Sequence, residues 1–198
     1  MTEHMLEFIK SRRSTRKYKA DPIPEEMLNQ VIEAGRYAPS GGNNQTAHFL
    51  VFRDPEVLRT LAELAAEEFA KIEVTEGMYK SLANSIHRAK LGGYIFHYNA
   101  PVLIAVANRA DYSNNIADTS CCLENMMLMA NALDLGSCWI NQLKWLNENE
   151  RLTAYLQAHG LREGERIYGA VAVGFPDTAD GLPIREPLKR TGNEVTFI

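Results

Sequence analysis

Residues 38–54 read APSGGNNQTAHFLVFRD, and this stretch holds a helix end, a loop, a strand and the start of another helix. Pro39 ends the preceding helix, and the run rich in glycine and asparagine after it is typical of a loop. The apolar segment His48–Phe52 favours a strand. Asp54 before Pro55 is the pattern of a helix N-cap with proline at the first helical position. A strand placed between helices in this way predicts a sheet with helices packed on it.

The same mixture of elements continues in both directions along the chain. Helices are expected within residues 5–9, 22–38, 54–69, 114–135 and 147–159, with a mobile helical excursion within 74–99. Further strands are expected at residues 101–107, 137–140, 167–174 and 195–198. The run at 101–107 is apolar throughout, which predicts a central strand buried on both faces. The expected fold is α+β or α/β, as a single domain over residues 1–198 with one layer of sheet.

Composition narrows the class of protein. The chain has 198 residues, of which 45% are hydrophobic and 23% charged, with a net charge of −4; this indicates a globular protein and disfavours a nucleic-acid partner. Three cysteines without a CxxC pair argue against a disulfide framework or a zinc ribbon. The longest strongly apolar run, 100–107, is far shorter than the ~20 residues that a membrane helix needs. We therefore expect a cytoplasmic protein without a membrane partner.

A basic cluster near the N-terminus is the first candidate site. Three guanidiniums and the Ser14 hydroxyl fall within five residues, at Arg12, Arg13, Ser14 and Arg16. Such groups can surround a phosphate with charge-assisted hydrogen bonds. A solvated basic surface loop has the same composition, so the residues alone leave both interpretations open.

Three further segments carry groups suited to a ligand. The loop 39–45 offers glycines for close backbone approach and polar side chains for the heteroatoms of a ring or sugar, although an ordinary turn explains it equally. The stretch 136–141, GSCWIN, could border a planar cofactor or form a buried strand with a core tryptophan. Lys189 and Arg190 could complete a phosphate site or keep a tail solvated.

Other chemistries find no support in the residue pattern. The five histidines show no HExxH or i, i+4 pairing, so no metal site is expected. The chain has no GxSxG nucleophile elbow. Cys138 has no partner nearby in the sequence, and a buried thiol is the simpler interpretation.

Taken together and in order, these segments resemble the nitroreductase family of FMN-dependent flavoproteins. The resemblance rests on RRSTRKY at 12–18, the stretch APSGGNNQTAHFLVFRD, the later LENMMLMANALDLGSCWI, the strand AVAVGFP and the basic tail. It covers essentially the whole chain. It implies an α+β fold with a mostly antiparallel sheet flanked by helices, built as an intertwined homodimer. The tail 185–198 would cross to the partner subunit, where residues 195–198 would add a strand.

The resemblance also assigns roles to particular residues. FMN would lie at the subunit interface, with NAD(P)H as electron donor, and the flavin would carry the chemistry without a catalytic side chain. The cofactor-binding residues would be Arg12, Arg13, Ser14, Arg16, Trp139, Ile140, Asn141, Lys189 and Arg190, with Pro39, Ser40, Gly41 and Asn43 from the other subunit. The variable excursion 74–99 would form a lid, and Tyr79, Tyr94, Phe96 and Tyr98 are candidates for the acceptor pocket, with core packing as the alternative.

Two departures from the family pattern weaken parts of this assignment. Many members have Gln-Pro-Trp where this chain has Gln45, Thr46 and Ala47, so an aromatic side chain is missing near the strand. The tail lacks the usual proline after its basic pair and has Thr191 and Gly192 instead. The second departure leaves open which of Lys189 and Arg190 contacts the phosphate.

The function implied is hydride transfer from NAD(P)H through FMN to a nitroaromatic, quinone or similar planar acceptor. Within the same fold, the alternatives are dehalogenation, enone reduction or flavin fragmentation. A flavin-binding module for storage or redox sensing is an alternative of another class. An interaction domain whose arginines bind an anionic partner would be colourless.

Overall fold

An antiparallel sheet of four strands forms the centre of the fold in the computed structural model, which describes residues 2–198. The strands run in the order β1-β2-β4-β3, and each neighbouring pair is antiparallel. Their bounds are His48–Phe52 (β1), Val102–Arg109 (β2), Gly136–Ile140 (β3) and Glu165–Gly174 (β4). These strands confirm the four predicted within the body of the chain, and the fold class is α+β.

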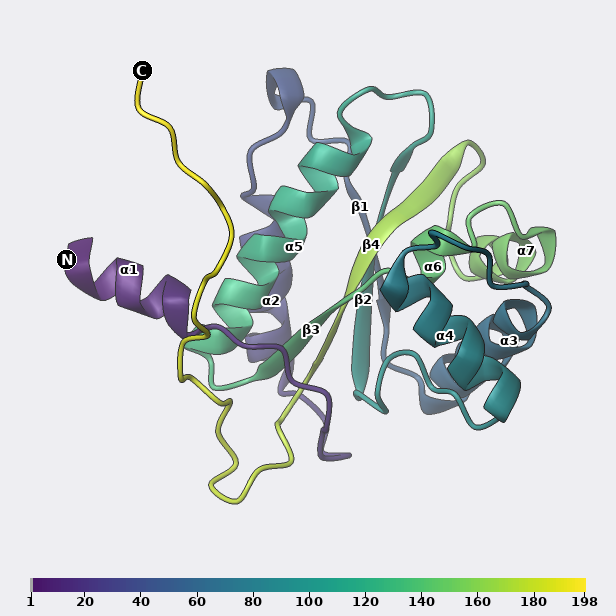
Figure 1. Ribbon diagram of the computed structural model, residues 1–198, viewed down its shortest axis with the longest axis horizontal. Coiled ribbons are helices and arrows are strands. Elements are labelled where there is room, and N and C mark those ends of the chain that lie inside the picture. Colours follow the sequence, from purple (N-terminus) through teal and green to yellow (C-terminus); the bar gives the residue numbers. More distant parts are fainter. Residues whose placement is uncertain (1) are drawn as a thin grey trace.

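Helices cover both faces of this sheet. Their bounds are Thr2–Ser11 (α1), Glu25–Arg36 (α2), Pro55–Ala70 (α3), Lys80–Leu91 (α4), Asn115–Ala132 (α5), Gln142–Trp145 (α6) and Glu150–Ala158 (α7), with a 3₁₀ turn at Gly41–Asn43 (η1). Figure 1 shows α2 and α5 on one side of the sheet and α3, α4, α6 and α7 on the other. The helix α1 and the C-terminal tail project from this body.

The strand β2 joins the two layers because its side chains alternate between two separate cores. Val102, Ile104 and Val106 pack with residues of α2 and α5. Leu103, Ala105 and Ala107 pack with residues of α3 and α4. All seven residues from 102 to 108 are buried, as expected for a central strand covered on both faces.

The start of α3 confirms the predicted cap. The Asp54 carboxylate accepts hydrogen bonds from the backbone N–H groups of Glu56 at 2.8 Å and Val57 at 3.3 Å. Pro55 occupies the first turn, where its missing N–H would have no partner in the helix. This short sequence therefore fixes where the chain leaves β1 and begins the helical layer.

Two predicted helix boundaries were wrong. The helix expected over 114–135 ends at Ala132, because Asp134 takes a positive φ of 59° and Gly136 already belongs to β3. The helix expected over 147–159 begins only at Glu150, because the Asn149 side chain caps it by accepting from the Leu152 N–H. Residues 195–198 pair with no strand of the described part of this chain, and the strand expected there on the sheet of a partner subunit stays a prediction.

The excursion within 74–99 contains α4, in agreement with its predicted helical character. Across residues 2–198, none of the helices combines the length and apolarity needed to cross a bilayer.

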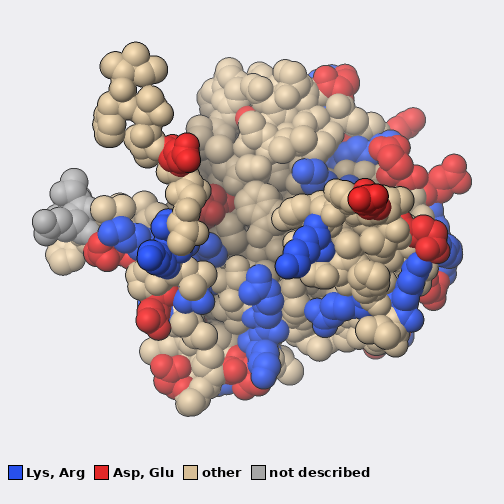
Figure 2. All heavy atoms as spheres, in the orientation of Figure 1, with Lys and Arg blue, Asp and Glu red and all other residues tan. Residues whose placement is uncertain are grey.

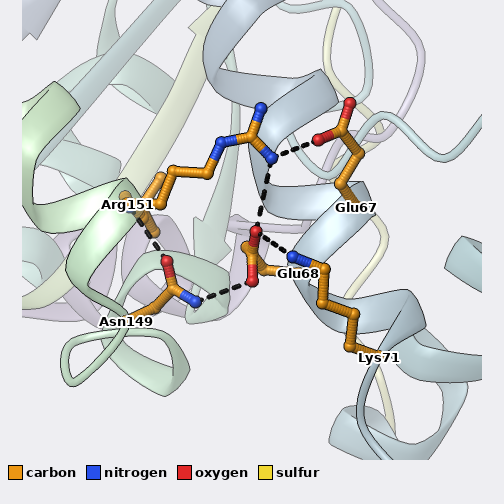
Figure 3. Close-up of polar contacts among 6 residues, drawn as sticks. Glu67, Glu68, Lys71, Asn149 and Arg151 are labelled. Carbon is orange, nitrogen blue, oxygen red and sulfur yellow. Dashed lines mark hydrogen bonds and ion pairs between the residues drawn. The ribbon is translucent and has the colours of Figure 1, made fainter.

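A buried carboxylate joins the helices α3 and α7 (Figure 3). Glu68 on α3 is only 7% exposed. Its oxygens accept from Lys71 Nζ at 2.6 Å, from Asn149 Nδ2 at 2.8 Å and from Arg151 at 3.4 Å. The hydrogen bond from Lys71 is the main reason that the pKa of Glu68 lies below its usual range, with Asn149 and Arg151 adding to it and burial opposing it.

We expect Glu68→Gln to lower the free energy of unfolding at pH 7 by about 1–3 kcal/mol, because a buried charged hydrogen-bond acceptor is lost. A carboxylate with a depressed folded pKa stabilises the protein above its unfolded pKa and loses that effect as the pH falls through the folded value. The difference in the free energy of unfolding between the native chain and the Glu68→Gln variant should therefore shrink below about pH 4.3. Urea denaturation at pH 3 to 7 measures it.

Glu67→Gln is the matched control, since Glu67 also binds Arg151 but its side chain is 55% exposed. Glu67→Gln should change the free energy of unfolding by no more than about 0.5 kcal/mol. Equal losses in the two variants, or a Glu68→Gln difference that persists unchanged to pH 3, would contradict this role.

Candidate functional site

The N-terminal basic segment lies against the free edge of β3. Ser14 forms a parallel bridge with Ser137, and the Thr15 N–H donates to the Ser137 carbonyl at 2.8 Å. Gly136 makes this approach possible, because a Cβ there would lie 2.7 Å from the Thr15 side chain. Two segments separated by about 120 residues in sequence are thus brought together, as the prediction of one shared site requires.

The arginines of this segment face few carboxylates. Arg12 Nε lies 4.0 Å from Glu124 Oε1, and Arg13 donates to the Glu186 carbonyl at 2.6 Å. The Arg16 guanidinium lies 6.0 Å from the centre of the Tyr98 ring. Among the side chains that the structure describes, four arginines form no ion pair, and three of these are candidate site residues: Arg13, Arg16, Arg88 and Arg190.

This arrangement leaves positive charge available for an anion. Figure 2 shows Lys and Arg side chains gathered at the base of the N-terminal helix, where the tail passes. Most other arginines of the described chain are paired with a carboxylate within 3.6 Å. The local excess is notable in a chain whose net charge is −4. A phosphate is the kind of group that such a cluster binds.

The end of β3 supplies a second part of the site. Trp139 is half-buried, and its Nε1 donates to Asn141 Oδ1 at 2.8 Å, while Ile140 is buried. The Asn141 N–H donates to Gln142 Oε1 at 3.1 Å. The Gln142 amide then donates to the Tyr94 hydroxyl at 2.8 Å. Burial raises the pKa of Tyr94, so its hydroxyl stays protonated and serves this network. Sequence reasoning missed Gln142, although it directly follows the GSCWIN stretch.

The C-terminal tail passes the same place. Arg185 donates to the Asn131 carbonyl at 2.5 Å and to Asp134 Oδ1 at 2.6 Å. The carbonyl of the next residue, Glu186, is the one that accepts from Arg13. Lys189 and Arg190 follow within four residues and are exposed, so at most about 14 Å of chain separates them from this contact. Neither Arg185 nor Glu186 was singled out from the sequence.

The loop 39–45 is held elsewhere, at the N-terminal end of α5. The Gly41 N–H donates to Asp118 Oδ1 at 3.1 Å, and the Tyr112 hydroxyl donates to Asp118 Oδ2 at 2.9 Å. Asp118 lies thirteen positions before Asn131 on α5, a rise of about 20 Å, and Asn131 is where the tail is anchored. Figure 1 shows η1 and the basic segment near opposite ends of α5.

One chain therefore does not unite all predicted residues. The loop residues Pro39, Ser40, Gly41 and Asn43 lie apart from the remaining candidates. Sequence reasoning also missed Tyr112 and Asp118, which fix the position of Gly41 through their hydrogen bonds.

The four aromatic candidates for an acceptor pocket lie in different surroundings. Tyr94 and Phe96 are buried among core residues, which is the alternative that the sequence left open. Tyr79 is 64% exposed and contacts the Trp145 ring edge-on. Only Tyr98, with a positive φ of 58°, lies beside the basic segment, through its contact with Arg16.

Cys138 lies next to the basic segment but does not have the properties of a nucleophile. It is a free, buried thiol on β3. Burial raises the pKa of Cys138, and the nearby Arg16, Ser14 and Arg12 only partly offset this effect. The thiol therefore stays protonated near neutral pH. The described site thus offers positive charge, a strand edge and an aromatic side chain rather than a nucleophile.

Comparisons with known proteins agree on one family. The model described as "Nitroreductase family" matches residues 9–175. A Thermus thermophilus protein named NADH dehydrogenase is 46% identical in an alignment of 195 positions that covers 90% of this chain and 90% of that protein. A crystal structure of a nitroreductase with bound FMN from Bacteroides fragilis has 36% identity and a TM-score of 0.83, covering 98% of this chain and 97% of the other. Iodotyrosine deiodinase 1 from Rattus norvegicus is 26% identical over 195 residues, covering 92% of this chain and 65% of that protein.

Proposed function

This chain belongs to the nitroreductase family, and we propose that it is an FMN-dependent oxidoreductase that uses NAD(P)H to reduce a nitroaromatic, a quinone or a similar planar acceptor. The observation that carries this proposal is the convergence of three segments at the free edge of β3. Residues 12–16, the start of β3 at Gly136 and Ser137 and the tail around Glu186 meet there, although they are far apart in sequence. The FMN-bound relative from Bacteroides fragilis, at 36% identity, supports the choice of cofactor.

The basic segment fits the phosphate of FMN. A phosphate monoester carries close to two negative charges at neutral pH. Arg13 and Arg16 have no carboxylate partner among the described residues, and Arg12 has only a distant one at 4.0 Å. In this proposal the three arginines and Ser14 hold the phosphate, and Lys189 and Arg190 add positive charge from the tail. Binding of a phosphate would also account for arginines without a carboxylate partner in an acidic protein.

The strand end would hold the ring system. Trp139, Ile140 and Asn141 would lie along the isoalloxazine, with the Gln142 network fixing the backbone at Asn141. When bound, FMN supplies hydride transfer between nicotinamide and acceptor. The side chains then need only to bind, orient and exclude water. No side-chain acid or base is assigned, in keeping with the protonated Cys138.

We further propose that the active form is a homodimer. The loop residues Pro39, Ser40, Gly41 and Asn43 would reach the site of a second copy, since within one chain they lie at the other end of α5. Large apolar side chains are exposed on α1 and on the tail: Met5, Leu6, Ile9, Leu188, Val195, Phe197 and Ile198. Such a set exposed in one chain favours burial against another.

A second candidate function comes from the relative named iodotyrosine deiodinase 1. Reductive dehalogenation would use the same flavin and the same basic segment, with a different acceptor. The 26% identity supports this candidate less than the 46% identity supports an NADH-linked enzyme. A third candidate is a flavin-binding module for redox sensing that turns over slowly or not at all.

The visible absorption spectrum of the purified chain is the first test of function. A flavin spectrum, with FMN identified after denaturation, is the expected result. Steady-state oxidation of NADH and NADPH should then accelerate on addition of menadione or nitrofurazone. Iodide release from 3-iodotyrosine instead would favour the dehalogenase, and a yellow protein without turnover would favour the sensor. A colourless chain that takes up no added FMN would overturn the proposal.

Arg12→Ala combined with Arg16→Ala should weaken FMN binding by about 3 kcal/mol or more, because each charge-assisted hydrogen bond contributes ~1.5–3 kcal/mol. Fluorescence titration of the apoprotein with FMN measures this loss. The matched control is Arg59→Ala on α3, since Arg59 is exposed and pairs only with Glu56 and Glu63. Unchanged FMN affinity in the double variant would show that these arginines do not hold the phosphate.

Removal of residues 189–198 should lower both the flavin content and the stability of the dimer, since the basic pair and three exposed apolar side chains are lost together. Sedimentation velocity and the flavin-to-protein absorbance ratio follow the two effects. Lys189→Ala with Arg190→Ala in the full-length chain should reduce flavin content while leaving the dimer intact. A truncated chain that remains a fully loaded dimer would rule out the proposed role of the tail.

A further inference from the structure

The first turn of α5 carries a buried carboxylate, that of Asp118. The residue is only 6% exposed, and it forms no ion pair with the side chains that the structure describes. Its oxygens accept instead from the Gly41 N–H, at 3.1 Å and 3.3 Å, and from the Tyr112 hydroxyl at 2.9 Å. Acidic side chains are rarely buried unless such partners compensate their charge.

The helix dipole is the simpler explanation for an acidic side chain at this position. A carboxylate in the first turn of a helix is stabilised there without any contact with a loop. The dipole does not account for the Tyr112 hydroxyl, which lies within reach of both Asp118 and the Gly41 carbonyl, the latter at 3.2 Å. The N–H and the carbonyl of Gly41 are thus both held by one small group of hydrogen bonds.

The loop 39–45 needs support of this kind because of its backbone conformation. Gly42, Asn43 and Gln45 have positive φ angles of 59°, 54° and 52°. The left-handed region is unfavourable for residues that carry a Cβ atom. Within the loop, the Gln45 N–H donates to Ser40 Oγ at 3.0 Å. Asp118 connects the loop to α5 and so fixes where it lies on the body of the protein.

The place where the loop is held decides which flavin site it can serve. Residues 42–45 are exposed, so this part of the loop is free to contact another molecule. The loop and the basic segment of the same chain lie near opposite ends of α5 (Figure 1). A loop fixed at the Asp118 end is therefore remote from the basic segment of its own chain, and in the proposed homodimer it serves the site of the partner.

We propose that Asp118 is a positioning residue for the flavin site of the partner subunit. It holds the Gly41 backbone, and thereby places Ser40 and Asn43 where they meet the FMN bound by the other copy. Asp118 itself does not touch the cofactor. This inference rests on the proposed function, because it requires FMN at the edge of β3 and a homodimer.

The first experiment titrates the full-length apoproteins with FMN and follows the fluorescence. Asp118→Ala should weaken FMN binding about tenfold, because the loop loses hydrogen bonds to a charged acceptor. Asp118→Asn should stay within about threefold, since its amide can still accept from Gly41 and donate to the Tyr112 oxygen. The matched control is Asp111→Asn, an exposed residue paired only with Arg109, and its FMN affinity should be unchanged.

The outcomes separate this inference from the proposed function. Native FMN affinity in Asp118→Ala would overturn the inference and leave the proposed function intact. A native chain that binds no FMN would overturn both. Equal losses in Asp118→Ala and Asp118→Asn would show that the hydrogen bond to Gly41 is not the cause, and would also overturn the inference.

The second experiment tests whether Asp118 acts on the partner subunit. A mixed dimer, isolated with two different affinity tags, carries Asp118→Ala in one subunit and Arg12→Ala with Arg16→Ala in the other. One of its sites then combines the intact arginines of the first subunit with the intact loop of the second. We expect one FMN per mixed dimer at native affinity, whereas both parent homodimers bind FMN weakly.

A role of Asp118 within its own chain, general stability included, predicts no native site in the mixed dimer, and that result would overturn the proposal. Tyr112→Phe keeps the test valid if Asp118→Ala does not fold, because it removes only the hydroxyl that bonds to Gly41 and Asp118. Its homodimer should bind FMN about fivefold more weakly, and its mixed dimer with the arginine variant should again regain one native site. Native affinity in the Tyr112→Phe homodimer would contradict the anchoring of the loop.

Discussion

The burial of β2 on both faces is the constraint on which the rest of the architecture depends. Its residues alternate between two cores, so helices must cover both sides of the sheet. Neither face then remains open to a charged ligand. A cofactor with a phosphate has to lie at an edge, where backbone groups are free to bond. The outer edge of β3 meets this need, and the basic segment 12–16 reaches it through Ser14 and Thr15.

The phosphate site proposed at this edge would also explain why positive charge is concentrated there in a protein of net charge −4. Arginines elsewhere on the described surface are mostly matched with nearby carboxylates, such as Arg36 with Glu33 and Arg185 with Asp134. Such exposed pairs contribute little to stability, but they cancel the local field. Arg13 and Arg16 have no such carboxylate partner, so the positive potential around them is not cancelled. The proposed anion site therefore rests on which arginines lack a carboxylate partner, rather than on the number of arginines.

Local signals in the sequence predicted the elements well, because their causes are local. The cap at Asp54, the apolar run of β2 and the helix α5 each depend on neighbouring residues. The contact of Thr15 with Gly136 depends on a fold that joins residues about 120 positions apart, so no local pattern could indicate it. The positions of Tyr94 and Phe96 could not be predicted either. The same residue type serves in a core and in a ligand pocket, so the sequence does not distinguish the two. The anchoring of Gly41 by Asp118 was also out of reach, and the assignment of site residues rested on family resemblance.

The two anchors of the tail differ in how freely evolution can change them. Arg13 binds the backbone carbonyl of Glu186, and every amino acid provides such a carbonyl. Position 186 can therefore drift without loss of that contact. Arg185 instead reaches Asn131 and Asp134 through its own guanidinium, so its replacement removes the anchor. Selection should accordingly act on adjacent positions with different strength. The unusual Thr191 and Gly192 lie beyond both anchors, where a change in sequence leaves the attachment of the tail intact.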